Sequence, residues 1–188
     1  SRYTLRRLYN RHDPLPQLEQ LMMLPGQARQ LRQRLDKSQG MILLADENRI
    51  NRVRSARAIA QSMTQPERRI LMSETTCHPV VAGTTQVTLP LVRQTKHLEA
   101  WRQACDMSHN VIIALETDHD PYRLTRLSMQ GTLVIQGVAA STAAKALAQM
   151  IASGVRPEAL ARTLTSVVAQ RQIELACPHC SSPCPTDE

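Results

Sequence analysis

Aromatic side chains are almost absent from this sequence. Its 188 residues contain no Phe, one Trp and three Tyr. Proteins that bind single-stranded nucleic acid usually stack the bases on aromatic side chains, so the composition argues against a nucleic-acid partner. The interior must instead be built from aliphatic residues and eight Met, which suits packed layers of helices and strands.

Long apolar runs are also missing. No stretch approaches the roughly 20 apolar residues of a membrane-spanning helix, and we expect no signal peptide. We therefore expect no membrane span and a cytoplasmic location, with attachment to the inner membrane only through partners. Because the chain begins with Ser1 rather than Met, we expect it to be part of a longer protein.

The five cysteines are an odd number, and three of them lie near the end of the chain, at Cys177, Cys180 and Cys184. This distribution favours a reducing compartment over a disulfide framework. Zinc usually takes four ligands, often from two Cys-x-x-Cys pairs, and only one such pair is present. The tail is therefore either the start of a structural zinc subdomain or a set of free thiols.

The net charge is +7, and Arg and Lys are concentrated in the first third of the chain. Such a region favours contact with an acidic partner surface or anionic lipid. A solvated helix face explains the same pattern, because Arg29, Arg32 and Arg34 alternate with Gln.

Apolar segments alternate with helical patterns along most of the chain. Strands are predicted at 40–45, 70–73, 84–89, 111–115 and 133–136, a short helical run at 18–24, and helices at 27–37, 52–63, 95–106, 121–129, 142–153 and 157–169. Apolar strands separated by helices indicate an α/β fold with a mostly parallel sheet covered on both faces. We expect a lead segment at 1–26, one core domain at 27–176 and a cysteine-rich tail at 177–188.

The segment from Gly40 to Arg57 has the outline of a phosphate-binding strand, loop and helix. Such a loop needs glycines, so that backbone N–H groups point inward, and then Lys and Ser/Thr for charge and Mg²⁺. The connection and the two residues after it contain none of these: Asp46, Glu47, Asn48, Arg49, Ile50, Asn51, Arg52 and Val53. The outline is therefore present without the residues that hold a phosphate.

Several collinear segments resemble the ATPases that drive type II secretion and type IV pilus assembly. The segments are 39–43 (QGMIL), 74–76 (ETT), 111–116 (VIIALE), 131–134 (GTLV), 154–157 (GVRP), 167–171 (VVAQR) and 177–180 (CPHC). The resemblance covers roughly residues 18 to 180 and implies a RecA-like P-loop NTPase core that works as a hexamer. It also implies other secretion or pilus ATPase subunits and an inner-membrane platform protein as partners, in a homo- or hetero-oligomer.

The resemblance also assigns candidate site residues. It places Asp46, Arg49 and Asn51 on the glycine positions of the phosphate loop, Arg52 on its lysine and Val53 on its Mg²⁺-binding threonine. Glu74 matches a glutamate of the acidic motif called the Asp box, Glu116 matches the Walker B glutamate, and Arg102 matches an arginine that acts between subunits.

The departures from the family motifs predict a protein that keeps the fold without the chemistry. Phosphoryl transfer depends on positioning and charge neutralisation, so each missing amide or cation removes transition-state stabilisation. We expect no functional P-loop, no bound ATP or Mg²⁺, and an assembly or interaction role in a type IV pilus or type II secretion machine. The alternative is a weak or unconventional ATPase that binds nucleotide through Arg49, Arg52 and Arg54 and hydrolyses it with Glu116.

Overall fold

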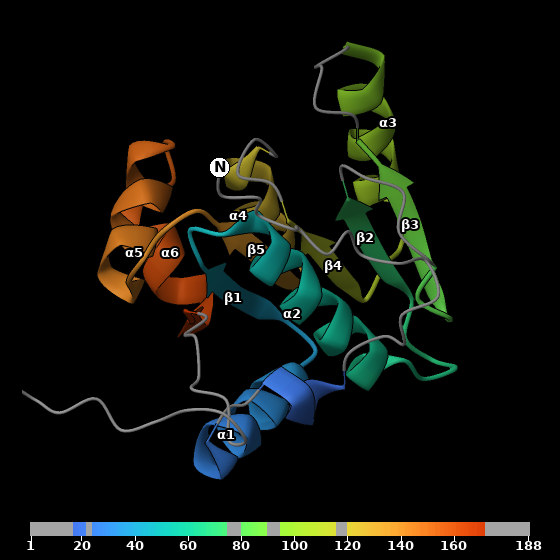
Figure 1. Cartoon of the computed structure of the whole chain (residues 1–188). Helices are drawn as coiled ribbons and strands as arrows, with labels where there is room; N and C mark the ends of the chain where they lie inside the picture. The colour runs from blue at the N-terminus through green and yellow to red at the C-terminus, as the bar shows by residue number, and fades with distance from the viewer. Residues whose placement is uncertain (1–16, 22–23, 75–79, 90–94, 116–119, 172–188) are drawn as a thin grey trace, which may run out of the picture.

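The computed structural model describes residues 17–21, 24–74, 80–89, 95–115 and 120–171 (Figure 1). Its helices are η1 (Leu18–Leu21), α1 (Pro25–Leu35), α2 (Arg49–Met63), α3 (Thr95–Asp106), α4 (Pro121–Met129), α5 (Ala143–Ala152) and α6 (Pro157–Thr163). Its strands are β1 (Gly40–Ala45), β2 (Ile70–Glu74), β3 (Thr84–Thr88), β4 (Val111–Ala114), β5 (Leu133–Val138) and β6 (Leu164–Ala169).

These strands form one sheet in the order β3-β2-β4-β5-β1-β6, and every pairing among them is parallel. The mostly parallel α/β sheet expected from the apolar runs is therefore confirmed. Because all strands run the same way, their amino ends share one edge of the sheet and their carboxyl ends share the other. We call these the amino edge and the carboxyl edge.

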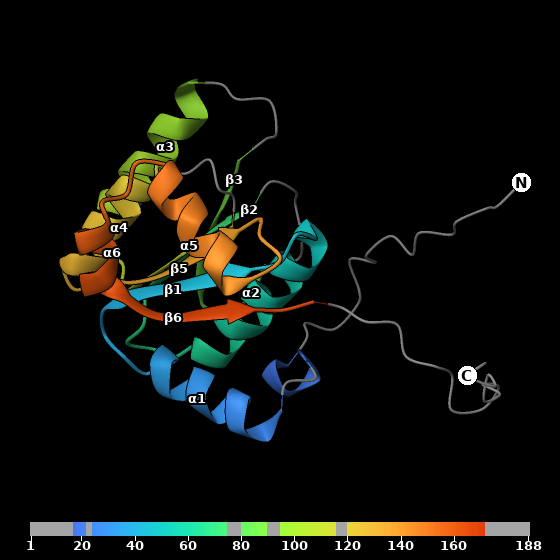
Figure 2. The same cartoon turned by 90° about the vertical axis from the view of Figure 1, so that its left-hand side faces the viewer.

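Helices cover both faces of the sheet (Figure 2). On one face, α1, α2 and η1 contribute to a cluster of buried aliphatic residues with Ile42 and Leu44 of β1. On the other, α3, α4, α5 and α6 pack against Met41 and Leu43 of the same strand. All six residues of β1 are buried, which is why this strand reads as an uninterrupted apolar run.

Helix starts follow the capping residues of the sequence. Thr142 accepts a hydrogen bond from the Lys145 N–H at the start of α5. Asp120 caps α4, where Pro121 takes the first helical position.

The predicted helix over 157–169 is wrong in its second half. The helix ends at Thr163, and Leu164–Ala169 forms β6, the outermost strand of the sheet beside β1. Residues 41–45 of β1 pair with this segment. Its Thr and Val side chains are β-branched and favour a strand, and the ladder to β1 supplies the backbone partners that a helix would have supplied internally.

Two helices begin earlier than predicted. α1 starts at Pro25, which occupies a first-turn position rather than stopping a helix. α2 starts at Arg49, one turn before Arg52, because Asn48 caps it. Among the described residues, no helix is long and apolar enough to cross a membrane.

Candidate functional site

The connection between β1 and α2 consists of only Asp46, Glu47 and Asn48. The Asp46 side chain is buried, at 4% exposure. One of its carboxylate oxygens accepts the backbone N–H of Asn48 at 2.7 Å, and the other accepts the side-chain amide of Asn51 at 3.2 Å. This carboxylate therefore lies against the amino end of α2, where the helix dipole favours negative charge.

Asn48 completes the turn as the N-cap of α2. Its side-chain oxygen accepts the Ile50 N–H at 2.9 Å. The N–H of Arg52 is the first to make a helical bond, to the Asn48 carbonyl at 3.2 Å. The N–H groups of Asn48 and Ile50 are thus bonded to the chain's own side chains.

Arg52 folds back onto the turn that precedes its helix. Its side chain is buried, at 4% exposure. The guanidinium donates to the backbone carbonyls of Asp46 and Glu47. The next residue, Val53, packs in the core beneath α2.

The first turns of α2 are also tied to the end of β6. The Gln170 backbone N–H donates to the Ala45 carbonyl at 3.0 Å, and its side-chain amide donates to the Ser55 hydroxyl. Gln170 belongs to the segment 167–171 that resembles the secretion ATPases, but the resemblance does not give it this role. The contact joins two segments that only the pairing of β1 with β6 brings together.

Glu74, at the carboxyl end of β2, forms a buried ion pair with Arg57 of α2. The Arg57 guanidinium donates to the Glu74 carboxylate at 2.7 Å, and the two side chains are 1% and 4% exposed. Burial raises the pKa of Glu74 above its ordinary value, and the charges of Arg57 and Arg49 offset part of that rise. Arg57 was not predicted as a site residue. The sequence nevertheless indicates that Arg57 is buried, because it lies four residues after Val53 and three before Ala60, on the apolar face of α2.

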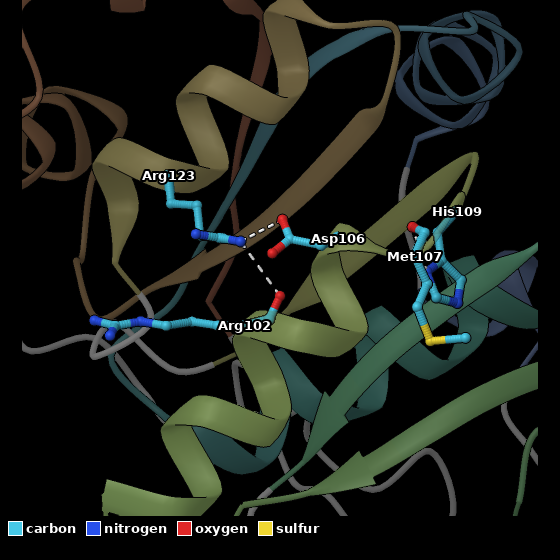
Figure 3. A network of polar contacts seen from close by, with 5 residues as sticks. All are labelled: Arg102, Asp106, Met107, His109 and Arg123. Carbon is cyan, nitrogen blue, oxygen red and sulfur yellow. Dashed lines mark hydrogen bonds and ion pairs between the residues drawn. The ribbon is translucent and has the colours of Figure 1, made fainter.

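Arg102 lies on α3, apart from the turn around Asp46. Its backbone carbonyl accepts a hydrogen bond from Arg123 of α4 at 3.3 Å, and Arg123 also pairs with Asp106 (Figure 3). The Arg102 side chain is exposed and points away from that pair. Its guanidinium has no hydrogen bond or ion pair within the described residues.

Other predicted site residues lie outside the described part of the chain. These are Glu116, Cys177, Cys180 and Cys184. Within the described ranges, no group of three or more His, Cys, Asp or Glu side chains is arranged to hold a metal ion. The tail's zinc ligation stays a prediction.

A parallel sheet covered on both faces, with a strand, tight turn and helix at its carboxyl edge, places this chain among the doubly wound α/β proteins. The sequence matches, over residues 1–188, the family model described as type II/IV secretion system protein. The chain belongs to this family. No curated protein sequence matches it.

Solved structures of the ATPase DotB and of a pilus retraction motor share the fold. The pilus retraction motor PilT with bound ADP superposes with a TM-score of 0.67 at 17% identity, over 85% of this chain and 49% of that one. The ATPase DotB of Yersinia pseudotuberculosis gives 0.66 at 13% identity, over 84% and 44% of the two chains. DotB of Legionella pneumophila gives 0.61 at 15% identity, over 78% and 42%. The chain therefore spans less than half of the length of each of these proteins.

Proposed function

We propose that this chain is a catalytically degenerate module of the secretion-ATPase family that acts in assembly rather than in ATP hydrolysis. The observation that carries the proposal is the carboxylate of Asp46 at the start of α2. A phosphate-binding loop presents its amides and the helix dipole to a bound anion. Here the chain supplies its own anion to that position, hydrogen-bonded to Asn48 and Asn51.

The electrostatics of this turn oppose a triphosphate. A phosphate oxygen placed about 4 Å from the Asp46 carboxylate would be repelled by about 4 kcal/mol at an effective dielectric constant of about 20. The Arg52 guanidinium does not compensate this repulsion, because it already donates hydrogen bonds to the carbonyls of Asp46 and Glu47. To reach a phosphate, it would have to leave those carbonyls and its buried position.

The residues around this turn also do not fit the way in which the family is expected to coordinate Mg²⁺. The resemblance puts Val53 where a hydroxyl would bind the ion, and a buried aliphatic side chain offers no oxygen ligand. The Glu74 carboxylate is already bound by the Arg57 guanidinium. We therefore derive no hydrolytic step through ATP or Mg²⁺.

The preserved fold supports an assembly role. The sheet, its two aliphatic clusters and its helix caps are intact. Arg102 projects an exposed guanidinium from α3, as expected for a residue that contacts a neighbouring subunit. The partners we propose are secretion or pilus ATPase subunits, as a homo- or hetero-oligomer, and a platform protein at the cytoplasmic side of the inner membrane.

Nucleotide binding is tested by thermal unfolding with and without Mg·ATP. A ligand present at about 100 times its Kd stabilises the fold by about 2.7 kcal/mol, so even weak specific binding is detectable at millimolar nucleotide. We expect no saturable shift. A saturable shift that Arg52→Gln abolishes would favour the alternative, an unconventional ATPase. In that case Glu116→Gln should also abolish turnover, whereas we expect it to leave any background turnover unchanged.

The assembly role is tested by purifying the full-length tagged protein from its native cells and identifying the co-purifying subunits by mass spectrometry. We expect secretion or pilus ATPase subunits, and their loss with Arg102→Ala. The matched control is Arg156→Ala, since Arg156 is an exposed arginine at the N-cap of α6 whose side chain makes no capping bond. Equal loss in both variants, or recovery of the protein alone, would contradict the assignment.

A further inference from the structure

The amino edge of the sheet carries two open hollows, on the opposite side of the molecule from the turn around Asp46. The first has a volume of about 720 Å³ and is lined by the residues that precede β2, β3 and β4, among them Arg68, Arg69, Met107 and His109. The second has a volume of about 810 Å³ and is lined by the residues that precede β1 and β6 and by the end of α4, among them Lys37, Met129 and Arg162.

The two hollows share a chemical pattern of basic side chains beside an exposed methionine. Lys37, Arg69 and Arg162 are exposed, and within the described residues their charged groups make no hydrogen bond or ion pair. Met107 is 67% exposed and Met129 is 47% exposed. A methionine is flexible and polarisable, and it adapts to apolar groups of different shape.

Positive charge dominates this edge although carboxylates are present. Asp36 lines the second hollow, and Glu67 precedes Arg68 in the loop beside the first. Arg68 donates to the Leu35 carbonyl at 3.1 Å, which fixes the end of α1 next to the start of β2. His109 bonds the Met107 carbonyl through Nδ1 at 3.1 Å (Figure 3), which leaves its other ring nitrogen for a ligand.

The spacing of the hollows defines the size of a common ligand. The starts of β2 and β1 are separated by three strand spacings in the sheet order, or about 14 Å at about 4.8 Å per spacing. An extended chain covers that distance with about five residues. One short segment can therefore place a carboxylate beside Arg68 and Arg69 in the first hollow and another beside Lys37 and Arg162 in the second. The same segment can place an apolar side chain at each methionine.

We infer that the amino edge is a docking surface for an extended acidic segment of a partner protein, with carboxylates spaced to reach both hollows. Two concave sites with exposed methionines suit a peptide that can enter them. A flat bilayer would instead be expected to bind a protruding surface. The scarcity of aromatic residues disfavours single-stranded nucleic acid. The inference stands whether or not the opposite edge binds nucleotide, so its outcome is separable from that of the proposed function.

The test uses the full chain and a fluorescent peptide of about ten residues with two Glu near each end and Leu between them, followed by anisotropy. Screening shortens the reach of surface charges to about 3 Å at 1 M salt, so we expect binding at 50 mM salt and loss of binding at 1 M. Lys37→Gln and Arg69→Gln should each weaken binding by about two- to five-fold, the range for exposed ion pairs. Their factors should multiply in the double variant, because the hollows are far apart.

Arg156→Gln is the matched control, since it removes the same charge from an exposed helix start. We expect it to bind the peptide as the unmodified chain does, and circular dichroism checks that each variant is folded. Equal weakening in all variants would overturn the inference and show a non-specific charge effect. Absence of peptide binding would also overturn it, including the case where phosphatidylserine vesicles or a DNA duplex bind through Lys37 and Arg69 instead.

Discussion

The buried ion pair between Arg57 and Glu74 provides the sharpest test of the structure. Both side chains are almost fully enclosed, at 1% and 4% exposure, and their polar atoms are 2.7 Å apart. Removing one member of such a pair leaves an uncompensated buried charge, which costs about 3–5 kcal/mol. Since small domains are stable by only about 5–15 kcal/mol, Arg57→Met should lower the free energy of unfolding by a large fraction.

The loss should depend on pH in a defined direction. The pKa of Glu74 is raised in the folded chain by burial, with Arg57 as the main opposing cause. A raised folded pKa gives a stability contribution that is complete below the unfolded pKa, about 4.3, and is lost as pH rises through the folded pKa. Removing Arg57 raises that pKa further, so Arg57→Met should cost about 3–5 kcal/mol at high pH, and its cost should fall as the pH is lowered from 8 to 5, because protonation removes the buried charge of Glu74.

Urea unfolding followed by circular dichroism at the two pH values measures this effect. The matched control is Arg54→Met, an exposed arginine on the same helix, which should change stability by no more than about 0.5 kcal/mol. Arg57→Met/Glu74→Leu should recover most of the loss at pH 8, because a well-packed apolar pair often replaces a buried ion pair without penalty. The reasoning is refuted if Arg57→Met costs no more than Arg54→Met, or if its cost is the same at pH 5 and pH 8.

Three further predictions concern local structure. Asn48→Ala should destabilise the fold by about 1 kcal/mol through loss of the α2 cap, while Asn48→Asp keeps the cap and most of the stability in urea unfolding. Gly137→Ala should cost about 1–3 kcal/mol, because its Cβ would lie 2.5 Å from the Leu115 carbonyl oxygen, whereas Gly26→Ala meets no atom within 4 Å and should not destabilise. Burial raises the pKa of the Cys105 thiol to about 12, so in a variant with the other four cysteines changed to Ser, a thiol reagent at pH 8 should label it slowly until urea unfolds the chain. Fast labelling of the folded chain would contradict its buried position.

The strands near the centre of the sheet were predictable because their environment is uniform. β1 and β4 are buried on both faces, so polar and apolar residues do not alternate in their sequences. This uninterrupted apolar pattern is typical of interior parallel strands. The starts of α4 and α5, after Asp120 and Thr142, were predictable as well, because capping residues act within a few positions of the chain. The cap at Asn48 acts in the same way, but the start of α2 was predicted one turn too late.

The edge strand β6 was not predictable in the same way. It continues directly from α6, and its half-exposed residues resemble an amphipathic helix as much as a strand. Its β-branched residues Thr165, Val167 and Val168 were the available sign of a strand. This segment forms a strand because it pairs with β1, which is far away in the sequence.

The sequence by itself determined that the turn after β1 lacks glycine, lysine and a Mg²⁺-binding hydroxyl, because that property belongs to residue types. Only the tertiary structure decided what takes their place. Asp46 caps the turn, Arg52 bonds its carbonyls, and Arg57 neutralises Glu74 across the interface of α2 with β2. The physical reason is that a buried charge takes whichever partner packing brings within hydrogen-bond distance, and packing depends on the whole sheet rather than on the neighbouring sequence.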